Sequence, residues 1–161
     1  MRLAPLVAGL MSLLATLSPS AAQGQGGRGL NALSRQSLDF GMLFTGTATK
    51  VSRFDALRAG QFELRGEKGA EVRVDLGLPS ALNGPGGGRV PLTFGSGDGG
   101  YTRDGTIATA APFDPRAALI TTLSSNGRLY IFLGGTATPA ARQPAGSYTG
   151  TITLTIAYTG T

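Results

Sequence analysis

Residues 146–158 read Gly-Ser-Tyr-Thr-Gly-Thr-Ile-Thr-Leu-Thr-Ile-Ala-Tyr. Side chains of a β-strand alternate between two faces, so this stretch sorts into an apolar face and a polar face. The apolar face holds Tyr148, Ile152, Leu154, Ile156 and Tyr158, with Gly150 among them. The polar face holds the threonines Thr149, Thr151, Thr153 and Thr155. The pattern predicts one long strand from Tyr148 to Tyr158, with one side in a core and the other in water.

Shorter runs with the same alternation precede this stretch. They fall at residues 38–44, 50–54, 60–66, 70–76, 90–94 and 129–133, and Pro91 favours an edge position for the run at 90–94. Glycine- and proline-rich loops are expected at 79–88 and 95–100, and a tight turn at Ser125-Asn126-Gly127. We therefore predict an all-β fold, an immunoglobulin-like antiparallel β-sandwich of about seven to nine short strands. A closed barrel is the alternative architecture.

The first 22 residues have the pattern of a cleavable signal peptide. Arg2 provides the positive charge, an apolar stretch runs from Leu3 to Leu17, and small residues surround a predicted cleavage site after Ala22. The apolar stretch is shorter than the ~20 residues that a membrane-spanning helix needs. We therefore expect an exported protein, in the periplasm, at the cell surface or outside the cell, with no transmembrane segment in the mature chain. The expected organisation is signal peptide 1–22, flexible leader 23–36 and one domain over 37–161.

Composition narrows the function classes. The chain has neither cysteine nor histidine, which excludes disulfides, thiol chemistry, serine–histidine triads and histidine-ligated metals. Its formal charge of +5 comes from scattered residues without a basic run, so we expect no nucleic-acid partner. No catalytic residue, cofactor site or metal site is predicted, and the chain is expected not to be an enzyme.

Two groups of carboxylates are candidate sites. Asp98 and Asp104 lie in a glycine-rich loop but lack the spacing of a calcium loop, so a solvated loop is the preferred interpretation. Glu63, Glu67, Glu71 and Asp75 alternate with basic residues, which favours a solvated sheet face over paired catalytic acids. Tyr130 and Phe132 are either an exposed, sugar-binding pair or part of a strand buried on both faces, the simpler explanation.

Three segments in this order resemble a known family. They are Leu38-Asp39-Phe40-Gly41, the turn Leu133-Gly134-Gly135-Thr136, and the segment from Gln143 into the last strand. Together, over most of residues 36–158, they resemble the bacterial secreted family of domains of unknown function numbered forty-four-oh-two. More distantly the chain is similar to spore coat protein U and to chaperone–usher pilins.

The resemblance to pilins implies a role for the last strand. In those proteins a glycine and a tyrosine twelve positions apart mark the terminal strand, as Gly146 and Tyr158 do here. The strand borders an open groove that a neighbour's N-terminal arm fills by adding a strand. By this resemblance the candidate assembly strand comprises Gly146, Tyr148, Ile152, Leu154, Ile156 and Tyr158.

The function expected from the resemblance is that of a non-enzymatic structural or interaction protein, a subunit of a pilus-like or surface-coat assembly. Its partners would be like subunits or a periplasmic chaperone. The alternative is a self-contained, monomeric binding module for a glycan or another cell-surface ligand. Periodicity alone reports burial, so the last strand is also explained as an ordinary core strand.

Overall fold

The computed structural model describes residues 10–11, 14–17 and 29–160. Its described residues form β-strands and two short 3-10 helices, with no α-helix among them. The strands are β1 (Leu10–Met11), β2 (Leu14–Leu17), β3 (Asn31–Gln36), β4 (Gly41–Met42), β5 (Thr49–Val51), β6 (Gly60–Arg65), β7 (Glu71–Gly77), β8 (Ala81–Asn83), β9 (Arg89–Thr93), β10 (Gly99–Thr102), β11 (Ala111–Phe113), β12 (Leu119–Thr122), β13 (Arg128–Leu133), β14 (Gly135–Ala137) and β15 (Thr151–Tyr158). The 3-10 helices are η1 (Pro85–Gly87) and η2 (Ile107–Thr109). The predicted all-β fold is confirmed.

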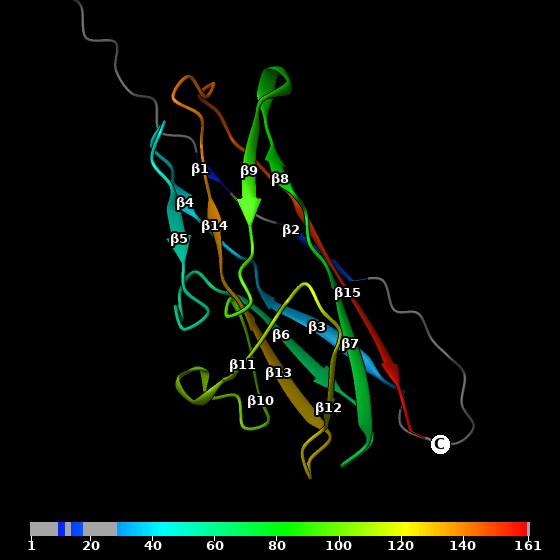
Figure 1. Cartoon of the computed structure of the whole chain (residues 1–161). Helices are drawn as coiled ribbons and strands as arrows, with labels where there is room; N and C mark the ends of the chain where they lie inside the picture. The colour runs from blue at the N-terminus through cyan, green and yellow to red at the C-terminus, as the bar shows by residue number, and fades with distance from the viewer. Residues whose placement is uncertain (1–9, 12–13, 18–28, 161) are drawn as a thin grey trace, which may run out of the picture.

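Three larger sheets and one two-stranded pair organise these strands (Figure 1). The first sheet has the order β11-β10-β13-β6-β3, the second β12-β7-β15-β2, and the third β5-β14-β9-β8, while β1 pairs with β4. Among the described strands, all pairs are antiparallel except β2 with β15. The first and second sheets face each other as the two layers of a sandwich.

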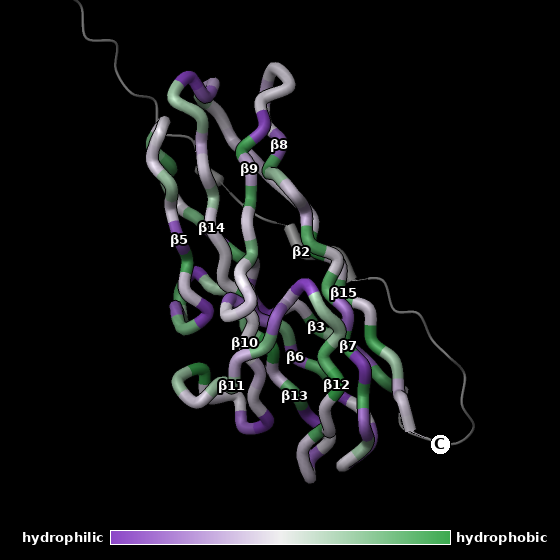
Figure 2. The backbone as a smooth tube through the Cα atoms, in the orientation of Figure 1, coloured by the Kyte–Doolittle hydropathy of each residue, from purple (hydrophilic) through white to green (hydrophobic). Residues whose placement is uncertain are grey.

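The core lies between these two layers because each strand sends alternate side chains inward. Along β7, hydrophobic and hydrophilic residues alternate, as the changing colour of the tube shows (Figure 2). The fully buried side chains of the first sheet meet those of the second in one cluster. It includes Phe62, Leu64, Leu129, Ile131 and Leu133 from β6 and β13, and Val72, Val74, Ile152, Leu154 and Ile156 from β7 and β15.

The third sheet joins the two layers at one end of the molecule. β14 continues β13 after the single residue Gly134, and β8 forms a bridge from Asn83 to Thr149, just before β15. A side chain at position 134 would meet the backbone of Val51 and Arg53, so glycine allows this close approach. Short interruptions such as Gly134 divide the chain between residues 31 and 158 into more strands, and shorter ones, than the sequence predicted.

Several local expectations differ from the structure. Residues 31–36, which we placed in the flexible leader, form β3 and pair with β6. Leu38 and Phe40 are buried as the alternation predicts, but Met42 and Phe44 are about half exposed. The reason is Gly41, whose positive φ of 64° redirects the chain after Phe40.

The region around Pro91 also departs from expectation. The loop expected at 79–88 contains β8 and η1, and β9 lies inside the third sheet between β14 and β8 instead of at an edge. Proline is tolerated there because the pairing of β14 with β9 covers Leu92 and Thr93 and ends before Pro91. The ambiguous stretch 117–123 contains the strand β12.

Candidate functional site

The candidate assembly strand is a buried strand with two differently covered edges. Along one edge β15 pairs antiparallel with β7, from Thr153 opposite Gly77 to Tyr158 opposite Val72. Along the other edge its first half, residues 151–154, pairs in parallel with β2, residues 14–17. β2 belongs to the segment that we predict to be removed as a signal peptide.

β2 lies at the seam between the two layers of the sandwich. β15 is its neighbour in the second sheet, and β3, the last strand of the first sheet, is also near it. Figure 1 shows β15 running along β7, with β2 close to its beginning. The seam between β15 and β3 is therefore the position where one additional strand fits.

The inner face of β15 is apolar, as predicted. Ile152 and Leu154 are each 1% exposed and Ile156 is 4% exposed, while Thr151 and Thr155 on the other face are exposed. Tyr158 is partly buried, and its hydroxyl accepts a hydrogen bond of 2.8 Å from the backbone amide of Glu67. Four of the predicted groove residues therefore lie on one strand with their apolar parts turned toward the core.

Gly146 and Tyr148 were predicted to belong to the assembly strand, but both lie outside β15. β15 begins at Thr151, so the expected continuous strand is interrupted at Gly150, and only the bridge at Thr149 precedes it. Tyr148 is 1% exposed, with its ring against Gly84 and Gly88 on either side of η1. These two residues anchor the loop before β15 to the third sheet and do not line the strand's edge.

The Tyr148 anchor depends on close approach and on hydrogen bonds. A Cβ atom at Gly84 would lie 2.5 Å from the Tyr148 ring, and one at Gly146 would overlap the ring of Pro85. The Tyr148 hydroxyl accepts a hydrogen bond from the Gln143 side-chain amide and donates one to the Pro144 carbonyl, both at 2.7 Å. The glycines in this part of the sequence predicted loops, but they did not indicate that Gly84 and Gly88 both pack against Tyr148.

Replacing Tyr148 by phenylalanine is expected to lower the free energy of unfolding by about 1–2 kcal/mol, because two buried hydrogen bonds lose their shared hydroxyl. Urea unfolding monitored by fluorescence measures the change. Tyr101→Phe is the matched control, because the Tyr101 hydroxyl makes no hydrogen bond within the described part of the chain. A loss no larger for Tyr148→Phe than for Tyr101→Phe contradicts the prediction.

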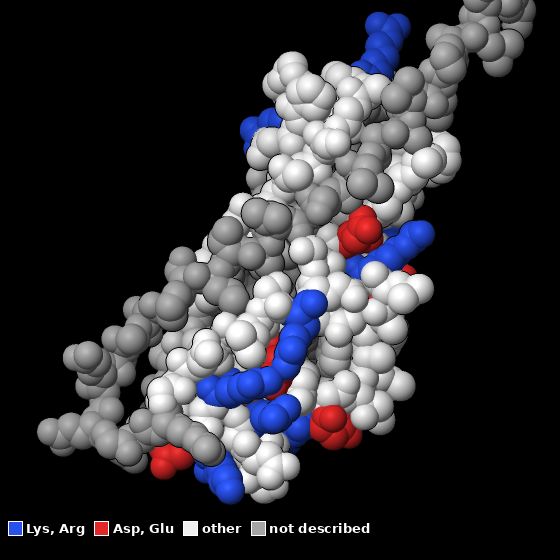
Figure 3. All heavy atoms as spheres, turned by 180° about the vertical axis from the view of Figure 1, so that it is seen from behind, with Lys and Arg blue, Asp and Glu red and all other residues white. Residues whose placement is uncertain are grey.

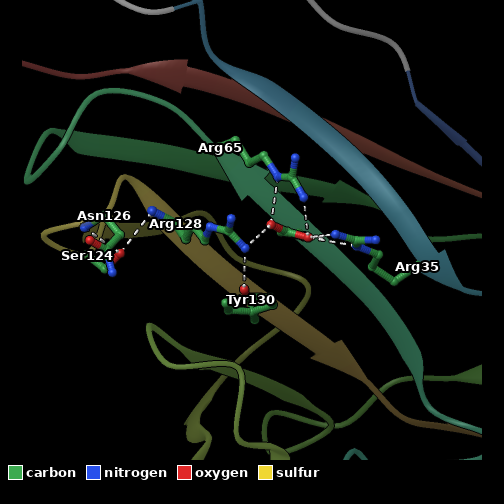
Figure 4. Close-up of polar contacts among 7 residues, drawn as sticks. Arg35, Arg65, Ser124, Asn126, Arg128 and Tyr130 are labelled. Carbon is green, nitrogen blue, oxygen red and sulfur yellow. Dashed lines mark hydrogen bonds and ion pairs between the residues drawn. The ribbon is translucent and has the colours of Figure 1, made fainter.

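A second feature, which we did not predict, lies on the outer face of the first sheet. Arg35 from β3, Arg65 from β6 and Arg128 from β13 surround the carboxylate of Glu63 (Figure 4). Nε of Arg65 lies 2.7 Å from Glu63 Oε1, and Nη1 of Arg128 lies 3.2 Å from the same oxygen. Arg35 binds Oε2. We call these four residues the arginine cluster.

Glu63 is buried within the arginine cluster, so its expected place on a solvated face is wrong. Its side chain is 1% exposed, whereas those of the three arginines are 45–50% exposed. The Arg65 hydrogen bond outweighs the opposing effect of burial and, with the contribution of Arg35, lowers the pKa of Glu63 to about 2. The only local signal in the sequence was the Glu63-x-Arg65 spacing, which places both side chains on one face.

The other acidic candidates interact with neighbouring groups of the chain. Asp98 accepts the backbone amide of Gly95 at 2.7 Å and lies 3.4 Å from Lys50 Nζ. Asp104 accepts hydrogen bonds from the Thr102 hydroxyl and the Thr106 amide. Within residues 10–11, 14–17 and 29–160, no three acidic side chains gather as metal ligands. Nor does this part of the chain contain a helix of the length and apolarity needed to cross a bilayer.

The comparison with protein families shows to which family the chain belongs. The family model described as a domain of unknown function (DUF4402) matches residues 30–158, which include β3 to β15. The chain belongs to the DUF4402 family. The predicted family is thereby confirmed, and its match begins at Leu30, one residue before β3, and not at residue 37. No curated protein matches the chain.

Proposed function

We propose that this DUF4402 protein is a non-enzymatic, exported subunit of a pilus-like or surface-coat assembly. In this proposal the edge of β15 that β2 occupies receives a strand from a partner protein after the leader has been removed. The observation that carries the proposal is the pairing of residues 151–154 with a segment that lies within the predicted signal peptide. Removal of that segment would leave the amide and carbonyl groups along this edge without their partners.

The apolar inner face of β15 is a second reason for this edge to bind an added strand. Ile152 and Leu154 belong to the core cluster and lie in the half of the strand that β2 covers. An added strand would cover the seam between β15 and β3 and satisfy the backbone groups at the same time. Strand addition of this kind gains affinity from main-chain hydrogen bonds and specificity from alternate side chains.

The position of β3 restricts the source of the strand. An N-terminal arm that donates itself to a neighbour must be free, but residues 31–36 already pair with β6 of their own domain. The remaining arm, residues 23–30, is Gln-Gly-Gln-Gly-Gly-Arg-Gly-Leu, and its one large apolar residue, Leu30, packs against the core. We therefore propose that a chaperone or a different subunit, and not a second copy's arm, provides the strand.

A peptide-binding experiment tests the proposal. The chain from Gln23 onward is titrated with a synthetic peptide of residues 10–18, and amide hydrogen exchange of residues 151–154 is followed by mass spectrometry. We expect binding and at least tenfold slower exchange in β15 when the peptide is bound. The control peptide carries proline in place of Ala15 and Leu17, which removes two backbone donors, and should bind at least tenfold more weakly.

Two results oppose the proposal. One is a chain from Gln23 whose residues 151–154 are fully protected without any peptide, which means that the edge closes by itself. The other is equal binding of the peptide with and without the prolines, which means that the peptide adheres without strand pairing. Native mass spectrometry of the protein exported by cells that express the full-length chain shows whether the mature chain starts at Gln23 and whether a partner accompanies it.

A further inference from the structure

A polar hollow adjoins the arginine cluster at the end of the sandwich where β12 turns into β13. Its volume is about 890 Å³, and Arg103, Asp104, Ser124, Asn126, Arg128 and Tyr130 are among the residues that line it. Arg128 belongs to both the hollow and the arginine cluster. Figure 3 shows basic side chains gathered on the rear face of the molecule, with acidic side chains between them.

The charges on this face do not cancel. Three guanidinium groups share the single carboxylate of Glu63, which leaves two positive charges in the arginine cluster. At the hollow, Arg103 and Asp104 add one charge of each sign. The three arginines are about half exposed, so this excess faces solvent and attracts an anionic group.

Arg128 is held in place while part of its guanidinium remains available. Its Nη1 lies 3.2 Å from Glu63 Oε1 and donates to the Tyr130 hydroxyl at 3.3 Å. Within the described part of the chain, Nε and Nη2 of Arg128 have no hydrogen-bond partner. Two such donors on one fixed guanidinium suit a carboxylate, which arginine binds through two parallel hydrogen bonds.

The rim of the hollow is fixed by the turn between β12 and β13. The Ser124 hydroxyl accepts the backbone amides of Asn126 and Arg128 at 3.3 and 3.0 Å, as Figure 4 shows. Gly127 has a φ of 73°, and a Cβ atom there would overlap the carbonyl oxygen of Gly66. The side chain of Asn126 is consequently presented from a backbone that has little freedom.

On the opposite side, the loop after β10 is also fixed. Arg103 donates to the Thr122 carbonyl at 2.8 Å and to the hydroxyls of Thr121 and Thr122, which ties this loop to β12. Hydrogen bonds from the Thr102 hydroxyl and the Thr106 amide lower the pKa of Asp104. Asp104 is therefore ionised at neutral pH and can accept hydrogen bonds from hydroxyl groups.

We propose that this hollow binds an acidic saccharide, with a sugar carboxylate on Arg128 and neighbouring sugar hydroxyls on Asp104 and Asn126. A ligand that offers one carboxylate beside several hydroxyls matches a site that offers guanidinium, carboxylate and amide groups. The Asp104 carboxylate disfavours a polyphosphate chain such as nucleic acid, because it would repel the backbone charges. The site lies on a different part of the molecule from the seam beside β2 and does not depend on the proposed strand addition.

Calorimetric titration with a hexasaccharide of uronic acid tests the proposal. We expect measurable binding of the acidic hexasaccharide and none of a neutral glucose hexasaccharide of the same length. Arg128→Gln should weaken binding at least tenfold. The matched control is Arg89→Gln, which removes the same charge from an exposed arginine on β9 whose side chain has no ion pair or hydrogen bond in the described part of the chain.

Further variants and ligands keep the test specific. Asp104→Asn and Asn126→Ala should each weaken binding at least threefold. These two variants test the site if a thermal unfolding measurement shows that Arg128→Gln is not folded. Titration with glucuronate monosaccharide separates recognition of a single acidic sugar from recognition of a polymer. Inorganic phosphate should compete weakly.

Three results would overturn the proposal. They are no binding of the acidic hexasaccharide, an equal loss in Arg128→Gln and Arg89→Gln, and complete displacement by phosphate at equal concentration. The last two would show general attraction between a positive protein and any anion. Because the chain from Gln23 can be tested without a partner strand, failure here leaves the assembly proposal unaffected.

Discussion

Leu154→Ala is expected to lower the free energy of unfolding by about 3–4 kcal/mol, the largest effect among the substitutions considered. Leu154 is 1% exposed and belongs to the cluster between the two layers. Shortening a fully buried leucine removes its transfer free energy and leaves a cavity, which together cost about 2–5 kcal/mol. Urea unfolding at neutral pH, with the circular dichroism of the sheets as signal, measures the loss.

The control for this substitution is the next residue along the strand. Thr155 is exposed on the other face of β15, so Thr155→Ala should cost less than about 1 kcal/mol. Similar losses for the two variants would contradict the placement of Leu154 on the inner face and Thr155 on the outer face. Repeating Leu154→Ala with the peptide of residues 10–18 bound tests how much of the burial depends on a strand beside β15.

Glu63→Gln is expected to destabilise the protein by about 2 kcal/mol at pH 7. The glutamine keeps the shape of the side chain but leaves Arg35, Arg65 and Arg128 without a common counter-charge. Breaking a buried charge pair costs about 3–5 kcal/mol, and the half exposure of the arginines reduces this value. Glu67→Gln is the control, because Glu67 is exposed and its carboxylate has no partner in the described part of the chain.

The same carboxylate makes stability depend on pH in acid. The pKa of Glu63 is lowered from 4.5 to about 2, so its contribution is complete above pH 4.5 and is lost as the pH falls toward 2. A shift of this size corresponds to at most about 3 kcal/mol, and solvent around the arginines reduces the expected loss to about 1–2 kcal/mol. Chemical unfolding between pH 2 and 5 should show this loss in the wild type and a smaller one in Glu63→Gln. Equal slopes in both proteins would contradict the assignment.

Most strands were predictable because their signals are local. The alternation in residues 70–76 and 129–133 corresponds to β7 and β13, whose inward residues are buried. After Phe40 the backbone turned unexpectedly because Gly41 adopts a positive φ of 64°. The end of the leader was predicted too late in the chain because residues 31–36 have no clear alternation of apolar and polar residues. They form β3 by pairing with β6, and the sequence of residues 31–36 alone does not predict this pairing.

The arginine cluster was not predictable because its members meet only through strand order. Pairing of β13 with β6 sets Tyr130 opposite Glu63 and Arg128 opposite Arg65. In β3 a bulge leaves Arg35 without a paired residue between Ser34 and Gln36, and bulges redirect side chains. A register different by one residue would have turned Glu63 into the core.

By itself the sequence determined that the chain is all-β, that the last strand has one apolar face, and that it carries the motifs of its family. These properties follow from the two-residue period of a strand and from the places of glycine and proline. Only the tertiary structure decided which edge of β15 lies at the seam, that β3 is already paired, and that three arginines share Glu63. Each of these depends on which strands become neighbours, and neighbours are chosen by the packing of the whole core and not by any single segment.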